Sequence, residues 1–235
     1  MRKSVIYFVG MFLLIVGISC QQNGGVPNVK LETPADSAGY AIGILVGTNN
    51  KEQIGNAPGG GDINLDAMVA GFAKAALDDS VEMTPEEADQ IVREFFTSAG
   101  ELAGQENLEA GNAFLEQNKE RPDVKVTESG LQYEVLQEGN GPVPKAEDRV
   151  RVHYHGTLID GTVFDSSVDR GEPAVFGVGQ VIPGWTEALK MMPVGSKWKI
   201  YLPSDLAYGD RGAGGDIGPN ETLIFEVELL EIVEE

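Results

Sequence analysis

The chain has 235 residues, enough for one large domain or two smaller ones, and an apolar content of 42% that allows a hydrophobic core. Its formal net charge at pH 7 is -20. Nucleic acids and anionic lipids bind basic surfaces, so this charge argues against both as partners. We interpret the excess of acidic residues as a solvated surface that keeps the protein soluble.

The first twenty residues have the pattern of a secretory signal. Arg2 and Lys3 precede an apolar run, which is shorter than the roughly 20 residues of a transmembrane helix. The run ends at Cys20, as in a bacterial lipobox, although Gly17 stands where leucine is usual. We therefore expect residues 1–20 to be a signal peptide and Cys20 to be lipidated. The alternative is ordinary signal cleavage that leaves a free thiol.

Residues 21–32 are polar and contain two glycines and a proline, which predicts a flexible tether. Thr33 and Pro34 then provide an N-cap and a favourable first helical residue. Apolar residues at helical spacing follow, and they share one face: Ala38, Ala41, Ile42 and Leu45. Glycine recurs every four residues at Gly39, Gly43 and Gly47. This stripe indicates either close approach of another helix or a poorly formed helix.

Two further helices are predicted before Pro122. The second has an amphipathic pattern formed by Leu65, Met68, Val69, Phe72 and Ala76. The third begins at the capping box Thr84-Pro85-Glu86-Glu87 and continues to about Lys119, a length on the order of 50 Å. Glycines at positions 100, 104 and 111 could instead break it in two. So long a helix is more typical of a spacer or a dimer element than of a compact core.

After Pro122 apolar and polar residues begin to alternate, as in β-strands. The alternation occurs in four stretches, at 131–135, 150–154, 198–202 and 223–229. Asp160-Gly161 predicts a two-residue hairpin turn, and Val163 begins the returning strand. Residues 184–192 allow one short helix. We therefore predict an α+β domain in which a half-open antiparallel sheet packs on this helix.

Aromatic and aliphatic residues of this second region are expected to form one pocket that also holds an acid and a phenol. The period of two puts Tyr154 on the inward face of its strand. Trp185 is expected to form the floor, and the Tyr208 hydroxyl to point at a ligand. Aromatic residues at these spacings are also typical of an ordinary core, and periodicity alone favours the core.

Residues 126–232 contain four motifs in a fixed order and spacing, VHYHGTLIDGTVFDSS, VIPGW, LPSDLAYG and TLIFEVELLEI. Together they resemble the FKBP-type peptidyl-prolyl isomerases. Residues 33–121 resemble, through looser motifs, the helical domain of the macrophage-infectivity-potentiator class of bacterial FKBPs. Those motifs are SAGYAIGILVG, MTPEE and ENLEAGNAFLEQN. Because that class is dimeric and exported, the resemblance implies a dimerisation domain over 33–122, with a long linker helix, and an isomerase domain over 123–235.

The resemblance also implies site residues, position by position. The pocket walls would be Tyr154, Phe164, Val181, Ile182, Trp185 and Phe225, with Ile217 on an outer wall. Asp165 and Tyr208 would be the polar groups, and Ile182 would also offer its backbone N–H. Ala213 stands where many members carry a histidine, and Gln180 stands where an acid is common. These two differences bear on substrate preference and leave the centre of the pocket intact.

The implied function is isomerisation of X–Pro bonds during the folding of exported proteins, without a cofactor. No nucleophile with a base beside it can be recognised, so no covalent intermediate is expected. The alternative is a periplasmic chaperone that holds unfolded clients and has weak isomerase activity. The expected partners are proline-containing polypeptides, a second copy of the chain and, through Cys20, a membrane of the cell envelope. The outer membrane of a Gram-negative bacterium is the expected location.

His153 and His155 stand two residues apart on a predicted strand, so both project to the face opposite Tyr154. This spacing can bind zinc, but no cysteine is near and spacing identifies no third ligand. We therefore predict solvent-facing histidines and no metal.

Overall fold

The computed structural model describes residues 28–77 and 80–233. Cys20, the predicted signal peptide and most of the predicted tether lie outside these residues. The chain divides into two compact units, residues 1–42 and 43–235, and the boundary lies inside the first helix. None of the helices in the described part of the chain is both long enough and apolar enough to cross a membrane.

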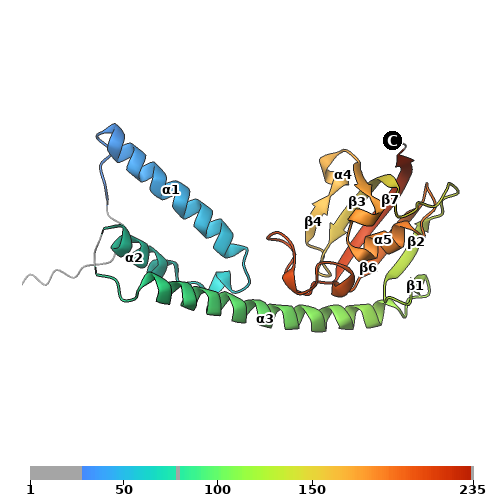
Figure 1. The fold of residues 1–235 in the computed structure, drawn as a ribbon, viewed down its shortest axis with the longest axis horizontal. Coiled ribbons are helices and arrows are strands. Elements are labelled where there is room, and N and C mark those ends of the chain that lie inside the picture. The colour runs from blue at the N-terminus through green and yellow to red at the C-terminus, as the bar shows by residue number, and fades with distance from the viewer. Residues whose placement is uncertain (1–27, 78–79, 234–235) are drawn as a thin grey trace, which may run out of the picture. The chain divides into compact units, whose positions relative to one another are not determined.

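The amino-terminal half consists of three α-helices, as the sequence predicts (Figure 1). Helix α1 (Pro34–Gly55) starts at Thr33, whose hydroxyl accepts the Asp36 N–H at 3.1 Å. A 3-10 turn, η1 (Gly60–Asp62), leads to α2 (Leu65–Ala76), which is capped by the Asn64 side chain. Helix α3 (Pro85–Asn118) has the predicted capping box at Thr84 and runs unbroken for 34 residues. The three glycines therefore do not divide α3.

The carboxy-terminal half is one antiparallel sheet in the order β1-β2-β6-β7-β3-β4, with β5 also paired to β3. Its strands are β1 (Val124–Val126), β2 (Gln132–Gln137), β3 (Arg149–Thr157), β4 (Val163–Ser166), β5 (Ala174–Gly177), β6 (Lys197–Leu202) and β7 (Leu223–Val233). Helix α5 (Pro183–Leu189) lies against this sheet, and a short α4 (Ser167–Arg170) follows β4. The predicted α+β class is confirmed. The sequence patterns did not reveal β1, β5 or α4, which are three or four residues long.

The core of the described chain is a cluster of buried side chains between the sheet and α5. Val150, Val152 and Tyr154 of β3 all lie inward, and the burial of β3 alternates residue by residue. Leu189 and Met192 are fully covered from the helix side. This alternation is the period of two on which the prediction was based.

The β3–β4 hairpin differs from its prediction in length. The Leu158 N–H donates to the Thr162 carbonyl at 2.9 Å, so the loop has three residues between this pair and not two. The Gly161 N–H also donates to Leu158, and Gly161 has a φ of 91°. A turn closed by a residue in the left-handed region matches the twist of the flanking strands, which explains why Gly161 closes a three-residue loop.

Candidate active site

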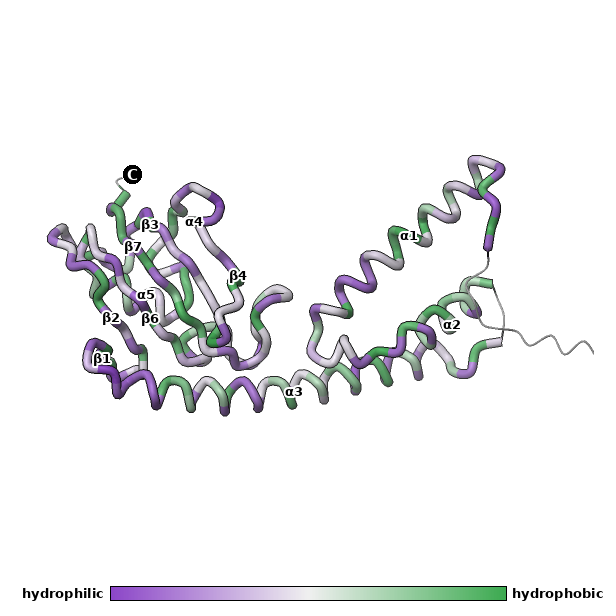
Figure 2. Tube along the Cα trace, turned by 180° about the vertical axis from the view of Figure 1, so that it is seen from behind, coloured by the Kyte–Doolittle hydropathy of each residue, from purple (hydrophilic) through white to green (hydrophobic). Residues whose placement is uncertain are grey.

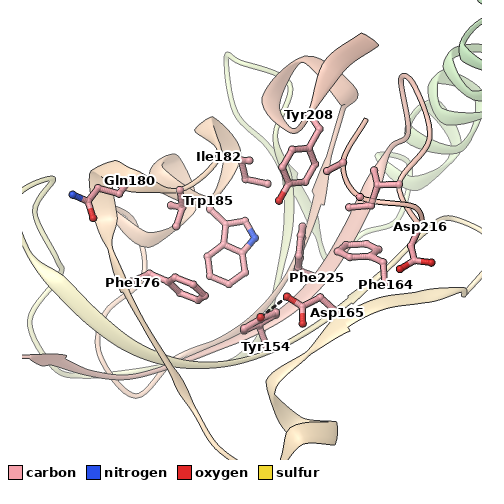
Figure 3. Close-up of a pocket in the computed structure, with 14 residues that line it drawn as sticks. Tyr154, Phe164, Asp165, Phe176, Gln180, Ile182, Trp185, Tyr208, Asp216 and Phe225 are labelled. Carbon is pink, nitrogen blue, oxygen red and sulfur yellow. Dashed lines mark hydrogen bonds between the residues drawn. The ribbon is translucent and has the colours of Figure 1, made fainter. Parts of the chain in front are cut away.

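A pocket of about 540 Å³ opens beside α5, between β3, β4 and the loop that follows Tyr208 (Figure 3). All nine residues predicted for the pocket line it: Tyr154, Phe164, Asp165, Val181, Ile182, Trp185, Tyr208, Ile217 and Phe225. They come from β3, β4, β7, the first turn of α5 and the loops that join these elements. The fold therefore brings together residues that are up to 71 positions apart, from Tyr154 to Phe225.

Trp185 forms the floor of this pocket and is 4% exposed. Three rings meet its indole edge-on: Tyr154 at 5.4 Å, Phe176 at 5.7 Å and Phe225 at 5.3 Å between centroids. Phe225 also meets Phe164 edge-on at 5.3 Å. Edge-to-face contacts are favourable for aromatic quadrupoles, so the rings hold each other in a fixed cage.

A polar network on one side of the pocket joins Tyr154, Asp165 and Arg170. The Tyr154 hydroxyl donates to the Asp165 carboxylate at 2.5 Å, and Arg170 forms an ion pair with the same carboxylate. The Arg170 guanidinium also donates to the Tyr154 hydroxyl at 2.8 Å and lies 5.5 Å from the centre of its ring. Arg170 is the last residue of α4, which begins directly after β4.

This network shifts the pKa of each member. Burial opposes the charged Asp165 carboxylate, but hydrogen bonds from Tyr154 and Arg170 and the charge of Arg170 outweigh it and lower the pKa of Asp165. Burial and the hydrogen bond to Asp165 raise the pKa of Tyr154, against the opposite effect of Arg170. Asp165 is therefore a carboxylate and Tyr154 a neutral phenol at neutral pH.

Two hydrogen-bonding groups of the pocket are available to a ligand. The Trp185 indole nitrogen is buried and has no hydrogen-bond partner within the described part of the chain. Tyr208 is 41% exposed, and Figure 3 shows its hydroxyl pointing toward the pocket above the indole. A buried N–H without a partner costs free energy, which a ligand carbonyl would recover.

The two histidines of β3 lie on the face opposite Tyr154, as predicted, but both are half-buried and not simply solvent-facing. His153 Nδ1 lies 3.1 Å from the Ser167 hydroxyl, and His155 Nδ1 lies 2.9 Å from the Ser166 hydroxyl. These contacts come from the last residue of β4 and the first of α4, and the strand period alone cannot predict them. Residues 28–77 and 80–233 contain no cluster of three or more metal-ligating side chains.

Sequence reasoning missed three residues that shape the site. Phe176 of β5 completes the cage, and Arg170 completes the polar network. Ser167 is fully buried and its hydroxyl accepts the Tyr154 N–H at 2.8 Å, which fixes the strand that carries Tyr154. Ser167 belongs to the FDSS motif and could have been identified there. Arg170 could not, because only the turn of α4 brings it back to Asp165.

The carboxy-terminal half thus combines an antiparallel sheet, packed on one short helix, with an aromatic pocket that has a polar network on one side. Two family models match the chain and together span most of it. One, described as "FKBP-type peptidyl-prolyl cis-trans isomerase", matches residues 141–230. The other, described as "Domain amino terminal to FKBP-type peptidyl-prolyl isomerase", matches residues 35–135.

Individual proteins agree with these models. The chain is 44% identical to the Outer membrane protein MIP of Legionella longbeachae, over 86% of this chain and 88% of that protein. It is 47% identical to the FKBP-type 22 kDa peptidyl-prolyl cis-trans isomerase of Escherichia coli, over 86% and 97% of the two chains. The crystal structure of FkpA from Escherichia coli matches with a TM-score of 0.59 and 36% identity, over 86% of this chain and 98% of that one. The chain belongs to the FKBP-type peptidyl-prolyl cis-trans isomerases, whose substrates are proline-containing polypeptides.

Proposed function

We propose that the pocket lowers the barrier to X–Pro rotation by desolvation and by polar stabilisation of the twisted amide. Amide conjugation gives this bond a barrier of about 18–20 kcal/mol and places negative charge on the carbonyl oxygen. Water stabilises that charge, so an apolar cage weakens the preference for the planar state. The observation that carries this proposal is the pocket itself, an aromatic cage with a polar network on one side.

Each group has a distinct proposed role in this mechanism. Tyr154, Phe164, Trp185 and Phe225 hold the proline ring, and Val181 and Ile217 extend the wall along the substrate chain. The backbone N–H of Ile182, which precedes α5, holds a substrate carbonyl. Asp165 and Tyr208 supply the polar field for the twisted state. Each tenfold gain in rate needs about 1.4 kcal/mol of preferential binding of that state.

Removal of the Tyr208 hydroxyl tests the polar part of this mechanism. Tyr208→Phe is expected to lower kcat/KM on a proline tetrapeptide about tenfold, since one hydrogen bond to the twisted state is lost. Tyr133→Phe is the matched control, because Tyr133 stacks on Trp198 and does not line the pocket. Equal rates for the Tyr208 variant and wild type would exclude a role for this hydroxyl.

The histidines provide a second test, because the mechanism does not use them. The double variant His153→Ala with His155→Ala is expected to retain isomerase activity if it folds. A folded but inactive double variant would contradict the proposed mechanism. Circular dichroism establishes folding, and isomer exchange measured by NMR establishes the rate.

Dimerisation through residues 33–122 is the second part of the proposal, and the exposure of the helices supports it. Helices α1 and α2 have no buried residue, although the structure describes both completely. Large apolar side chains on them are well exposed, including Leu45 at 70% and Phe72 at 57%. Apolar patches of this kind mark protein interfaces. Analytical ultracentrifugation of residues 21–235 tests this, and a monomer at micromolar concentration would refute it.

A membrane anchor at Cys20 is the third part, and it rests on the sequence pattern and on the printed name of the Legionella relative. We infer that the signal is cleaved immediately before Cys20 and that Cys20, as the first residue of the mature chain, carries lipid in the cell envelope, at the outer membrane. Several acyl chains on one residue suffice for stable attachment. Cys20→Ser is expected to shift the protein from the membrane fraction to the soluble fraction. Unchanged partitioning would exclude lipidation at this residue.

The chaperone function remains the alternative, and the exposed apolar helices are the observation that favours it. A dimer whose two pockets capture one unfolded chain gains effective concentration without new contacts. The two functions are separable by assay. A chaperone without catalysis would suppress aggregation of a proline-free client while leaving tetrapeptide isomerisation at the uncatalysed rate.

A further inference from the structure

One wall of the pocket is a loop, residues 209–220, which we call the pocket loop. Ala213, Gly214, Asp216 and Ile217 of this loop line the pocket, and Tyr208 immediately precedes it. At its tip the N–H of Ala213 donates to the Ile217 carbonyl at 2.9 Å, and the return bond is 3.2 Å. At its base the Asn220 N–H donates to the Gly209 carbonyl at 2.8 Å. Asn220 therefore closes the loop beside Tyr208.

Asn220 has an unusual backbone for its residue type. Its φ is 56°, and no other non-glycine residue among 28–77 and 80–233 has a positive φ. Asparagine tolerates this region better than most residues, but the conformation still has a cost and persists only where its surroundings hold it. Asn220 is held by the Gly209 carbonyl, which accepts its backbone N–H, and by α3, which binds its side chain.

The side chain of Asn220 joins the pocket loop to α3. Its Nδ2 donates to the backbone carbonyl of Gly104 at 3.2 Å. One turn further along α3, Asn107 Nδ2 donates to the Pro219 carbonyl at 2.9 Å. Two hydrogen bonds thus join the base of the loop to α3. A loop side chain donates one of them, and a helix side chain donates the other.

Two glycines allow this close approach. A Cβ at Gly104 would lie 3.1 Å from Asn220 Nδ2, and a Cβ at Gly111 would lie 2.2 Å from the Thr222 hydroxyl. Gly104, Asn107 and Gly111 are three and four residues apart, so they share one face of the helix. A Cβ at Gly100, on the same helix, would have no heavy atom of the described chain within 4 Å apart from its own chain neighbours and the nearby helix backbone. The face at 104–111 therefore contacts the base of the loop, at Pro219 and Asn220, and Thr222, which follows the loop.

We propose that Asn220 is a positioning residue for isomerisation, through which α3 holds the pocket loop and Tyr208 in the geometry that binds substrate. The proposal rests on the function proposed above for the pocket. Without the bond to Gly104 the loop samples more conformations, and substrate binding must then restore order at an entropic cost. That cost raises KM and leaves kcat unchanged, because a bound substrate restores the same geometry.

The test measures KM and kcat for proline tetrapeptides with the full-length protein. Asn220→Gly keeps a backbone that tolerates positive φ and removes the side-chain donor. Asn220→Asp keeps the shape but offers a carboxylate that cannot donate to the Gly104 carbonyl. Both are expected to raise KM about fivefold, as the loss of one hydrogen bond implies, with kcat within about twofold. Amide exchange in the pocket loop is expected to be faster in both variants.

Asn107→Ala is the second variant, since it removes the other bond to α3 and leaves the sequence of the loop intact. It is also expected to raise KM and to speed amide exchange in the pocket loop. Gly100→Ala is the matched control on the same helix and is expected to leave both unchanged. Combining Asn220→Gly with Tyr208→Phe is expected to lower kcat/KM by less than the two separate effects combined, since coupled residues are not additive.

The outcomes distinguish this inference from the function on which it rests. If wild type is active and Tyr208→Phe is impaired, but Asn220→Gly and Asn107→Ala keep the wild-type KM, the inference is wrong and the proposed function stands. If Tyr208→Phe is unimpaired, the role proposed for its hydroxyl fails, while raised KM values for the Asn220 and Asn107 variants still support positioning of the loop wall.

Discussion

The sheet domain and the first two helices bury their apolar residues to very different extents. Leu131, Ile200 and Leu229 of the sheet domain are fully buried in one cluster with α5. In α1 and α2 no residue is buried, and Figure 2 shows hydrophobic stretches along α2. The sheet domain therefore completes its core within one chain, and the helices do not.

The difference shows that the two halves are stabilised in different ways. A buried cluster stabilises a domain at any protein concentration, whereas an exposed apolar face gains stability only when a second surface covers it. The melting temperature of the sheet domain is therefore expected to be independent of concentration. The melting temperature of the helices is expected to rise with concentration if they form the proposed dimer.

The largest effect is expected from a cavity in the sheet core. Ile200 is fully buried, and Ile200→Ala is expected to lower the free energy of unfolding by about 2–5 kcal/mol. Val69→Ala, at a position 46% exposed in α2, is the comparison. It is expected to leave the melting of the sheet domain unchanged. Calorimetry of both variants measures the stability of the sheet domain. Equal destabilisation of this domain by the two substitutions would contradict the contrast between the halves.

A charge on the exposed face of α2 is expected to act on association alone. Phe72→Glu should raise the dissociation constant of the proposed dimer at least tenfold, or by about 1.4 kcal/mol, because burial of an unpaired carboxylate is costly. Leu136→Glu is the matched control, since Leu136 is 44% exposed on β2. Sedimentation at several concentrations reports the constant. An unchanged dissociation constant would show that α2 is not part of the dimer interface.

A smaller gain is expected from Gly100→Ala in α3. Apart from its chain neighbours and the nearby helix backbone, nothing in the described chain lies within 4 Å of a Cβ at this position, so only helix propensity changes. The expected stabilisation is up to about 1 kcal/mol. Thermal unfolding followed by the circular dichroism of the helices measures it. A loss of stability would indicate that another chain packs on Gly100.

The smallest effect is expected from acid acting on the polar network of the pocket. Because the pKa of Asp165 is lowered in the folded state, the network adds stability above the unfolded pKa of about 3.9, and this stability is lost as the pH falls through the folded pKa. Asp165→Asn is expected to remove this part of the acid dependence of the melting temperature. An identical acid dependence in the variant would show that other carboxylates account for it.

Periodicity and capping chemistry predicted the long elements because these signals are local. The capping box at Thr84 fixed the start of α3, and the alternation around Val152 fixed the inward face of β3. The residues of the pocket followed from the resemblance, since periodicity alone favoured ordinary core. What could not be predicted depends on contacts between distant segments. Phe176 reaches the cage through β5, a strand of four residues, and Asn220 reaches α3 across 116 positions of sequence.

The contact between α3 and the pocket loop was also hidden by an ambiguous signal. Glycines in a predicted helix usually indicate weakness, and Gly104 and Gly111 were considered as places where α3 could break. The structure shows them buried within an unbroken helix, where their lack of a side chain admits Pro219 and Thr222. Sequence alone does not distinguish a helix break from a docking face, because glycine is typical of both.

The placement of the tryptophans makes the two halves optically distinct. The chain contains two tryptophans, Trp185 in the pocket and Trp198 stacked on Tyr133 in the sheet. Fluorescence excited at the red edge of the indole band therefore originates in the sheet domain, while the far-ultraviolet dichroism is dominated by the helices. Emission from Trp185 should respond when a peptide enters the pocket, so ligand titrations need no attached dye. Melting followed at the two wavelengths would separate the unfolding of the halves in a single sample.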